Sequence, residues 1–145
     1  MASVKNVERW FTPQQLVYLA TAEGNQPRVR PVSLVMIKKR FYVITGARGG
    51  VKAEKLNQIK DNPQVEYYLP LQRNGSNGFI RGEGTAHIVD DPATKGRLYR
   101  VVEWAKDYLP SVDHPDYVLL EIKHSGYGFR EPGTTEIVRV KVKLE

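Results

Sequence analysis

The sequence predicts a small antiparallel β-barrel with helices at its periphery. Runs of β-favouring residues follow one another closely and are joined by short polar turns, as in hairpins. About seven such runs are present, whereas only two or three segments have helical spacing. Strands in consecutive runs favour an antiparallel sheet over a βαβ fold. The length of 145 residues suits one domain, so we expect residues 1–145 to form a single domain.

The composition narrows the class of protein. Hydrophobic residues make up 41% of the chain and charged residues 26%, and no apolar run approaches the roughly 20 residues that span a bilayer. The first residues lack the apolar centre of a secretory signal, and the chain has no cysteine. We therefore expect a soluble, cytoplasmic protein. The net charge of +6 favours anionic partners, but no basic run typical of a nucleic-acid-binding tail is present.

The first elements expected are a short helix and a hairpin. Residues 7–16 should contain a helical turn, with Thr12 as the N-cap and Pro13 in the first helical position. A strand at 17–21 then leads through a turn rich in Gly, Asn and Pro into a second strand at 29–37.

The end of this second strand, from Leu34 to Ile37, is apolar on both faces. This pattern predicts burial on both sides or contact with a partner subunit. The sequence K-K-R at 38–40 should be a solvated hairpin tip, followed by a strand at 41–46.

A segment with helical spacing follows this strand through several glycines, from about Gly50 to Lys60. Its unpaired first-turn amides could hold an anion. Lys52 and Lys55 fall in that turn, where cations oppose the helix dipole unless an anion compensates them. The alternative is that these lysines belong to a solvated helix face.

The central strands are expected at 65–69, closed by Pro70, and at 79–89, with a polar loop at 72–78 between them. In the second of these strands alternate residues should form the inner face. Gly82 and Gly84 lie on this face, which predicts a sharply coiled strand or another group packed on bare backbone.

The last part of the chain should hold one longer helix and three strands. The helix is expected from Pro92 to about Ala105, with Leu98, Val101, Val102 and Ala105 as its apolar stripe. Trp104 and Tyr108 are expected in the core, with an interface or a ligand contact as the alternatives. Strands are expected at 117–123, 127–129 and 136–144, with Ser125-Gly126 as a turn.

Several short motifs occur in a characteristic order. They are L-A-T-A-E-G-N-Q-P-R-V-R-P-V-S at 19–33, F-Y-V-I-T-G at 41–46, V-K-A-E-K-L at 51–56, D-N-P-Q-V at 61–65 and R-G-E-G-T-A at 81–86. This ordered set resembles the pyridoxamine 5'-phosphate oxidase-related family and spans roughly residues 7–122. The resemblance implies an FMN-binding split β-barrel, and a homodimer with FMN at the subunit interface.

The resemblance also implies which residues bind the cofactor. The strand segment at 30–33 would contact the flavin ring and ribityl chain, 44–45 would lie by the ribityl and phosphate, and Lys52 would bind the phosphate. Val51 stands where the family often has a second cation, and Arg48 or Lys55 is the candidate to replace it. The predicted cofactor-binding residues are Arg30, Pro31, Val32, Ser33, Ile44, Thr45, Lys52 and Lys55.

The implied function is that of an FMN-dependent oxidoreductase of unknown substrate. The flavin performs the redox step in such enzymes, and the protein supplies binding, orientation and the local field. Arg30 is our candidate for a positive group near the pyrimidine edge of the flavin, where it would stabilise the reduced form. The true oxidases carry a substrate-binding segment with Arg and His after the last strand, whereas this chain ends V-K-V-K-L-E. We therefore do not expect pyridoxamine phosphate to be the substrate.

Two other readings stay open at this stage. One is a cofactor-binding protein without turnover, such as a carrier, a sensor, or a haem- or deazaflavin-binding relative, in which His124 at the end of a strand could be an axial ligand. The other is a basic barrel that binds nucleic acid, which lacks an evident aromatic and basic strand face. The histidines show no close metal-ligand spacing.

Overall fold

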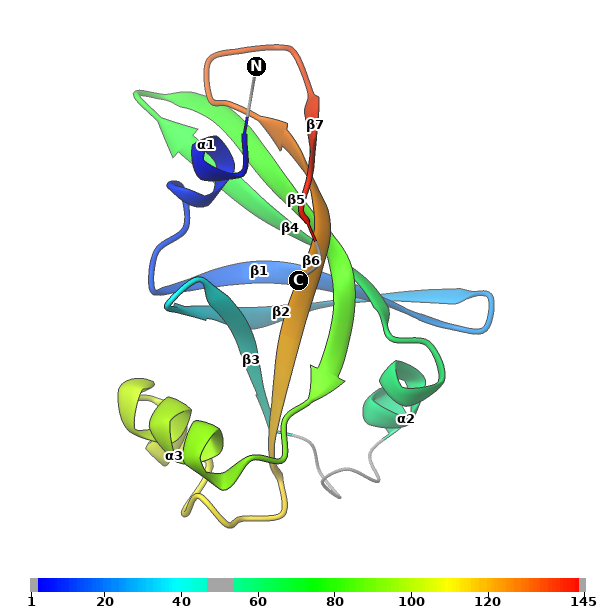
Figure 1. Cartoon of the computed structure of the whole chain (residues 1–145), viewed down its shortest axis with the longest axis vertical. Coiled ribbons are helices and arrows are strands. Elements are labelled where there is room, and N and C mark those ends of the chain that lie inside the picture. The colour runs from blue at the N-terminus through cyan, green and yellow to red at the C-terminus, as the bar shows by residue number, and fades with distance from the viewer. Residues whose placement is uncertain (1–2, 47–53, 144–145) are drawn as a thin grey trace.

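The computed structural model describes residues 3–46 and 54–143 (Figure 1). Its helices are α1 (Val4–Glu8), α2 (Glu54–Asp61), α3 (Pro92–Val101) and α4 (Ala105–Tyr108). Its strands are β1 (Gln14–Glu23), β2 (Gln26–Ile37), β3 (Arg40–Gly46), β4 (Gln64–Arg73), β5 (Ser76–Ile88), β6 (Tyr117–Arg130) and β7 (Val138–Lys141).

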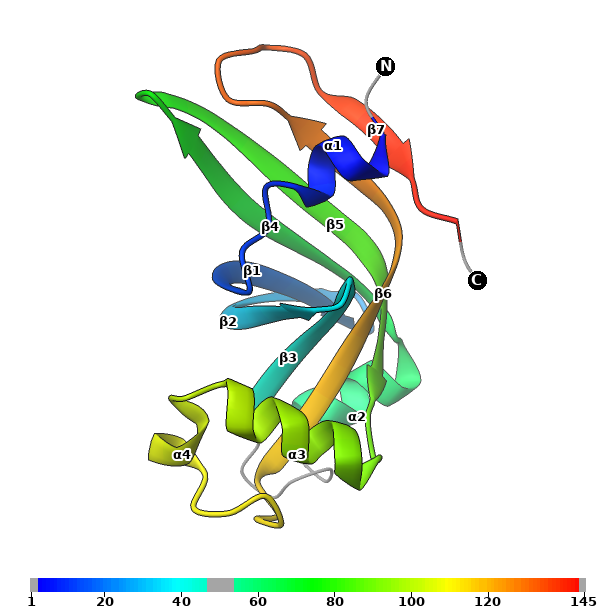
Figure 2. The same ribbon diagram turned by 60° about the vertical axis from the view of Figure 1, so that its left-hand side comes forward.

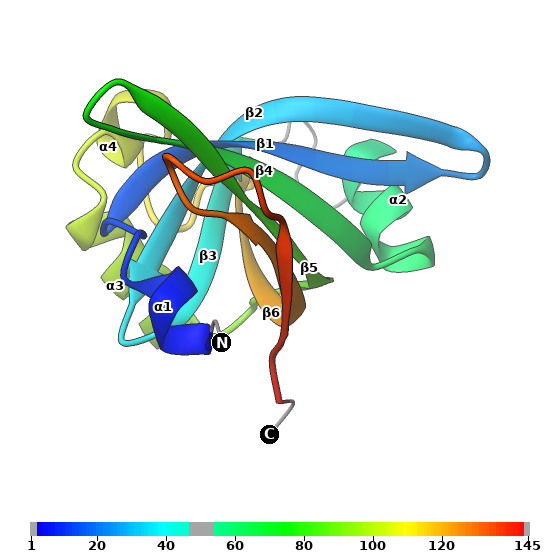
Figure 3. The ribbon, with the colours of Figure 1, turned by 90° about the horizontal axis from the view of Figure 1, so that it is seen from above.

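The strands form an antiparallel barrel, as the sequence predicted. Their order is β3-β2-β1-β4-β5-β6-β7, and a further pairing of β3 with β6 closes the first six strands on themselves. The seam between β1 and β4 is narrow, because only Tyr18–Ala20 pair with Glu66–Tyr68. The hairpin of β1 and β2 therefore reaches beyond the other strands on one side, with α2 beside it (Figure 3).

Tight turns join the neighbouring strands of the first half of the chain. Lys38 and Lys39 both have positive φ angles, 50° and 64°, so they form the predicted hairpin tip without a glycine. Asn74 and Gly75 form a second such turn, with φ angles of 51° and 80°. The predicted polar loop at 72–78 is therefore wrong. Both β4 and β5 continue to the two-residue Asn-Gly turn.

The main core fills the barrel and extends to a helix at each end. Val7 of α1 and Phe11 pack against it at one end, and Leu56 and Ile59 of α2 pack at the other. Leu56 and Ile59 are therefore the side chains by which α2 joins the core. The predicted inner face of β5 is confirmed, and a Cβ added at Gly82 would lie 2.2 Å from the Tyr67 ring.

A second core lies outside the barrel, where α3 and α4 cover part of its outer surface (Figure 2). Val35 of β2 and Ile44 of β3 pack there against Leu98 and Val102. Leu34 belongs instead to the interior core. The prediction that this end of β2 is buried on both sides is therefore confirmed.

The first helix differs from its prediction. It begins after Ser3, whose hydroxyl accepts from the Asn6 amide in a capping box, and it ends at Glu8. Thr12 caps no helix, since its backbone amide donates to the Gln15 side chain and its hydroxyl to the Gln14 carbonyl just before β1. The Thr-Pro pair therefore lies directly before a strand and not at the start of a helix.

Three later boundaries also differ. Pro70 does not close β4, because its missing amide falls outside the short stretch that pairs with β1. Ser125 and Gly126 are not a turn but lie within β6, opposite a register shift between Glu83 and Gly84. A bulge absorbs the extra residue there, so β6 continues to Arg130.

The predicted long helix is divided in two. The helix begins as expected, with Asp91 as its N-cap, and α3 ends at Val101 before the short α4. Within the predicted stripe, Val101 is exposed, whereas the other members are buried. Tyr108 is also exposed, so its expected place in the core is wrong, whereas Trp104 is partly buried against the second core.

Candidate functional site

The predicted cofactor-binding residues lie on two faces of the barrel wall. Neighbouring residues of a strand point to opposite sides, so Arg30 and Val32 face inward, and Pro31 and Ser33 face outward. The structure brings Arg30, Val32 and Thr45 together, because all three line one small cavity. It separates Ile44 from them, since this side chain packs under α3 in the second core.

The small cavity lies inside the barrel, where β2, β3 and α2 meet. Its volume is about 20 Å³. It is lined by Leu19, Thr21, Arg30, Val32, Val43, Thr45, Leu56, Ile59 and Leu120. Arg30 and the two threonines are therefore its only polar side chains among the described residues.

Arg30 is the cation of this group. Its Nη2 donates to the Thr21 hydroxyl at 3.4 Å, and the Thr21 side chain is buried. No carboxylate pairs with Arg30 in the described part of the chain. A half-buried guanidinium with one neutral partner retains donors for an anionic group. The guanidinium of Arg30 can therefore donate to an anionic group, although the cavity beside it has room for only about one water molecule.

The predicted anion site at the start of the helix cannot be described in the same way. Lys52 and Arg48 lie outside the described residues, as does the side chain of Lys55. The described part of α2 begins at Glu54, and its Leu56 and Ile59 line the cavity beside Arg30. The end of β3 that carries Thr45 is the end from which the chain leads toward these lysines.

The outward-facing predicted residues belong to an apolar surface on β1, β2 and β4. Pro31 pairs with Tyr18 across the hairpin, and Tyr18 pairs with Tyr68 across the seam. Leu16, Tyr18, Val29 and Tyr68 are exposed large side chains on these strands. We call Leu16, Tyr18, Val29, Pro31 and Tyr68 the open face. Sequence reasoning did not identify it, since each residue alone is an ordinary member of a strand.

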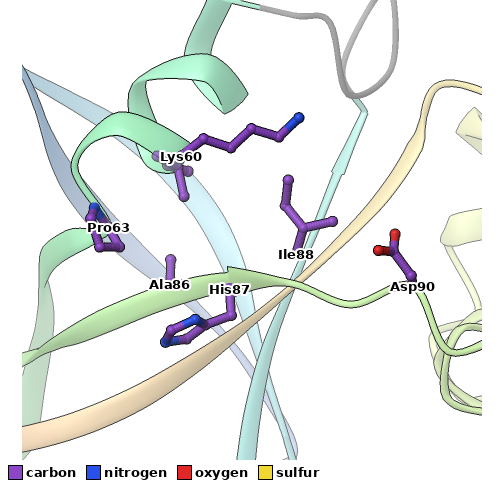
Figure 4. Close-up of a pocket in the computed structure, with 7 residues that line it drawn as sticks. Lys60, Pro63, Ala86, His87, Ile88 and Asp90 are labelled. Carbon is purple, nitrogen blue, oxygen red and sulfur yellow. The ribbon is translucent and has the colours of Figure 1, made fainter.

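A groove of about 550 Å³ lies between α2 and β5 (Figure 4). Lys60 of α2 reaches over it from one side and Asp90 lies at the other, with Ile88 between them. His87 points away from Lys60 in this view. These residues come from separate elements with unrelated patterns, so no signal in the sequence grouped them.

A buried polar pair lies in the interior, toward α1. His124 is in the middle of β6 and not at its end, and its Nε2 is 2.6 Å from the Tyr67 hydroxyl. Burial lowers the pKa of His124 to about 4 and raises the pKa of Tyr67 well above its ordinary value, with the Glu8 carboxylate adding to the latter shift. Both groups are therefore neutral at pH 7.

Comparison with solved structures shows the same fold. General Stress Protein 26 from Bacillus anthracis is 23% identical, with a TM-score of 0.70 over 93% of this chain and 96% of that one. An FAD-binding protein from Mesorhizobium loti is 16% identical, with a TM-score of 0.71 over 87% and 92%. A heme-binding protein from Mycobacterium smegmatis is 11% identical, with a TM-score of 0.64 over 89% of this chain and 53% of that one.

No protein of curated function matches the sequence significantly. Within the described residues, no helix is both long and apolar enough to cross a bilayer. The family model described as pyridoxamine 5'-phosphate oxidase matches residues 3–130, which is most of the chain. The antiparallel barrel, the ordered motifs and this match agree, and the chain belongs to the pyridoxamine 5'-phosphate oxidase family, whose fold is a split barrel.

Proposed function

We propose that this protein binds FMN and acts as an FMN-dependent oxidoreductase on a small-molecule substrate of unknown identity. In this proposal residues 1–145 form one FMN-binding split-barrel domain, and two copies form a homodimer with the cofactor at their interface. Family membership supports flavin binding in general. The identity of the flavin as FMN and its redox turnover are the parts that we propose.

The observation that carries the proposal is the partial burial of Arg30 without a carboxylate partner in the described part of the chain. This guanidinium is half-buried, has no carboxylate partner among the described residues, and shares a cavity with Thr21 and Thr45. A buried or half-buried cation is costly unless an opposite charge compensates it. A flavin nucleotide supplies such a charge on its phosphate, and on its ring when reduced.

Four of the eight predicted residues have a role in this proposal. Arg30 would hold an anionic group, oriented by its contact with Thr21, and the Thr45 hydroxyl would donate to a cofactor oxygen. Lys52 and Lys55 would bind the phosphate by virtue of their place in the family motif. When bound, FMN would supply the hydride and electron transfer that no side chain of the chain can perform.

The open face supports the homodimer. Its tyrosines and aliphatic side chains lie together on three strands, next to Pro31 and Ser33. Exposed apolar groups of this size gain free energy when another surface covers them. A second copy seated there would exclude water from the outward-facing half of the predicted site.

A cofactor-binding protein without turnover is the second candidate. One structural neighbour is named a heme-binding protein, but the likeness at 11% identity concerns the fold alone. His124 was the axial ligand that this alternative required. Its ring is buried and its Nε2 is engaged with the Tyr67 hydroxyl, so this nitrogen is already occupied in the structure. A non-catalytic flavin or deazaflavin carrier does not depend on His124 and stays the main alternative.

The test is a fluorescence titration of the purified protein with FMN, preceded by an absorbance spectrum of the protein as isolated. We expect the visible bands of an oxidised flavin, and a dissociation constant raised roughly 10- to 100-fold in Arg30→Ala and in Lys52→Ala, since each loses charge-assisted hydrogen bonds. Lys106→Ala, an exposed site on α4, is the matched control and should bind FMN like the wild type.

Three results would contradict the proposal. If the protein takes up no FMN, FMN is not its cofactor. If Arg30→Ala binds FMN with wild-type affinity, Arg30 does not contribute to FMN binding. FMN could also bind without turnover. If NADH does not reduce the bound FMN, and the dithionite-reduced protein passes electrons to no acceptor, the protein is a carrier and not an oxidoreductase.

A further inference from the structure

A cavity separate from the one at Arg30 opens at the start of β3, beside Arg40 and Phe41. Thr45 lies at the opposite end of this strand. The cavity has a volume of about 310 Å³. It is lined by Glu8, Lys39, Arg40, Phe41, Glu121, Ile122, Lys123, His124, Val142 and Lys143. These residues come from α1, the β2–β3 turn, β3, β6 and the segment after β7, which the β-barrel topology brings together.

The opening exists because β3 and β6 part at this point. Their pairing starts with Phe41 opposite Ile122, and β6 continues through Lys123 and His124, which pair with no residue of β3. The chain after β7 returns at the far side, where the Val142 amide donates to the Ser125 carbonyl at 3.0 Å. The cavity is therefore framed by backbone that the sheet itself holds in place.

The charges around the opening do not balance. Arg40 and Glu121 form a two-pronged pair, with N···O distances of 2.8 and 2.9 Å, and so neutralise each other. Lys39, Lys123 and Lys143 have no carboxylate partner in the described part of the chain. The remaining acid is Glu8, which accepts a hydrogen bond of 3.0 Å from the Tyr127 hydroxyl. Three lysines thus face one carboxylate, and the opening has an excess of positive charge.

The inner wall of the opening is apolar. Val142 is half-buried there, and Phe41 and Ile122, each 3% exposed, form the floor beneath it. The His124 ring contacts Phe41 edge to face at a centroid distance of 4.5 Å. Burial lowers the pKa of His124 to about 4, so the ring adds a neutral surface and no charge at pH 7. A site with an apolar wall and several lysine ammonium groups at its mouth matches a ligand with the same two parts.

We propose that this opening binds a small organic anion that joins an aromatic or aliphatic body to a phosphate or carboxylate group. The body would lie beside Val142, above the nearly buried rings of Phe41 and His124, and the anionic group would lie among Lys39, Lys123 and Lys143. This site is separate from the proposed flavin site, because Arg30 and Thr45 line a different cavity at the opposite end of β3.

The experiment is an isothermal titration of the full chain with phenyl phosphate, with inorganic phosphate and phenol as the two partial ligands. Phenyl phosphate should bind saturably and at least several-fold more tightly than phosphate, whereas phenol should show no binding at the same concentrations. The triple variant Lys39→Gln, Lys123→Gln, Lys143→Gln should weaken phenyl phosphate binding about tenfold or more. The ring nitrogen signals of His124 should shift on binding in the wild type.

Two controls separate this site from other anion sites. A triple variant with the same charge change, Lys5→Gln, Lys106→Gln, Lys141→Gln, removes lysines that do not line the opening, and should keep wild-type affinity. Arg30→Ala should also keep it. The proposal is overturned if phenyl phosphate does not bind, if both triple variants lose affinity equally, or if Arg30→Ala loses it instead. A loss of affinity in Arg30→Ala would mean that phenyl phosphate binds at the proposed flavin site and not at this opening.

Discussion

Val29 and Val35 lie on the same outer face of β2, six residues apart, and their surroundings are opposite. Val35 is 1% exposed because α3 and α4 fold over it, whereas Val29 on the open face is 69% exposed. The strand pattern is the same at both positions, so burial there depends on what the chain places above the strand. The protein covers one half of its outer wall with its own helices, and the other half is the surface on which we propose a second copy.

The covered half should contribute most to the stability of the fold. Leu98 of α3 is fully buried in the second core, and Leu98→Ala should lower the free energy of unfolding by about 2–5 kcal/mol, through lost burial and the cavity left behind. Val101→Ala is the control on the same helix, and should change it by less than about 0.5 kcal/mol because Val101 is exposed. Urea denaturation measures both. If the two substitutions lowered the free energy of unfolding equally, α3 would not pack on the barrel through Leu98.

The open face should instead control assembly. Tyr18→Asp places a charge in the middle of this face and should weaken the proposed dimer by about 10- to 100-fold, while the unfolding free energy of the monomer changes little. Sedimentation velocity over a range of protein concentrations measures this shift.

Tyr108→Asp is the matched control, since Tyr108 is an exposed tyrosine on α4, away from the open face. It should leave the association unchanged. A wild-type protein that is monomeric at high concentration, or a Tyr18→Asp dimer of normal strength, would show that the open face is not a subunit interface.

Tyr117 provides a smaller, pH-dependent test of the covered half. Its hydroxyl donates to the Lys95 carbonyl at 2.7 Å, and burial, with a smaller effect of Tyr99, raises the pKa of Tyr117 to about 12. The unfolded chain loses this proton near pH 10, so the stabilisation is complete below pH 10 and is lost as the pH rises toward 12. Tyr117→Phe should therefore cost about 1 kcal/mol at pH 7 and less at pH 11. A cost that is the same at both pH values would disprove the link to ionisation.

The strands and turns were largely predictable because their signals are local. Alternation in β5 identified its inner face, and the Asp-Pro pair identified the start of α3. Local signals failed where a distant partner decided the outcome. The Ser-Gly pair at 125–126 is typical of a turn, but β5 pairs along this whole stretch, and a bulge accommodates the extra residue.

The candidate site was predictable only in part. The family motifs pointed to the segment at 30–33 and to 44–45, and alternation alone implies that such neighbours cannot share a face. The cavity that joins Arg30 to Thr45 depends on β2, β3 and α2 meeting, which no local pattern reports. The buried pair of Tyr67 and His124 was missed for the same reason, since 57 residues separate its members.

The sequence by itself determined the antiparallel barrel, most of its strands and the family, because periodicity, turn residues and ordered motifs are properties of short stretches of chain. Tertiary structure alone decided which half of the outer wall is covered, which lysines surround the opening beside Arg40, and that no acid within residues 3–46 and 54–143 pairs with Arg30. The physical reason is that burial and charge pairing depend on distances between segments remote in sequence. Those distances are set only when the barrel closes through the pairing of β3 with β6.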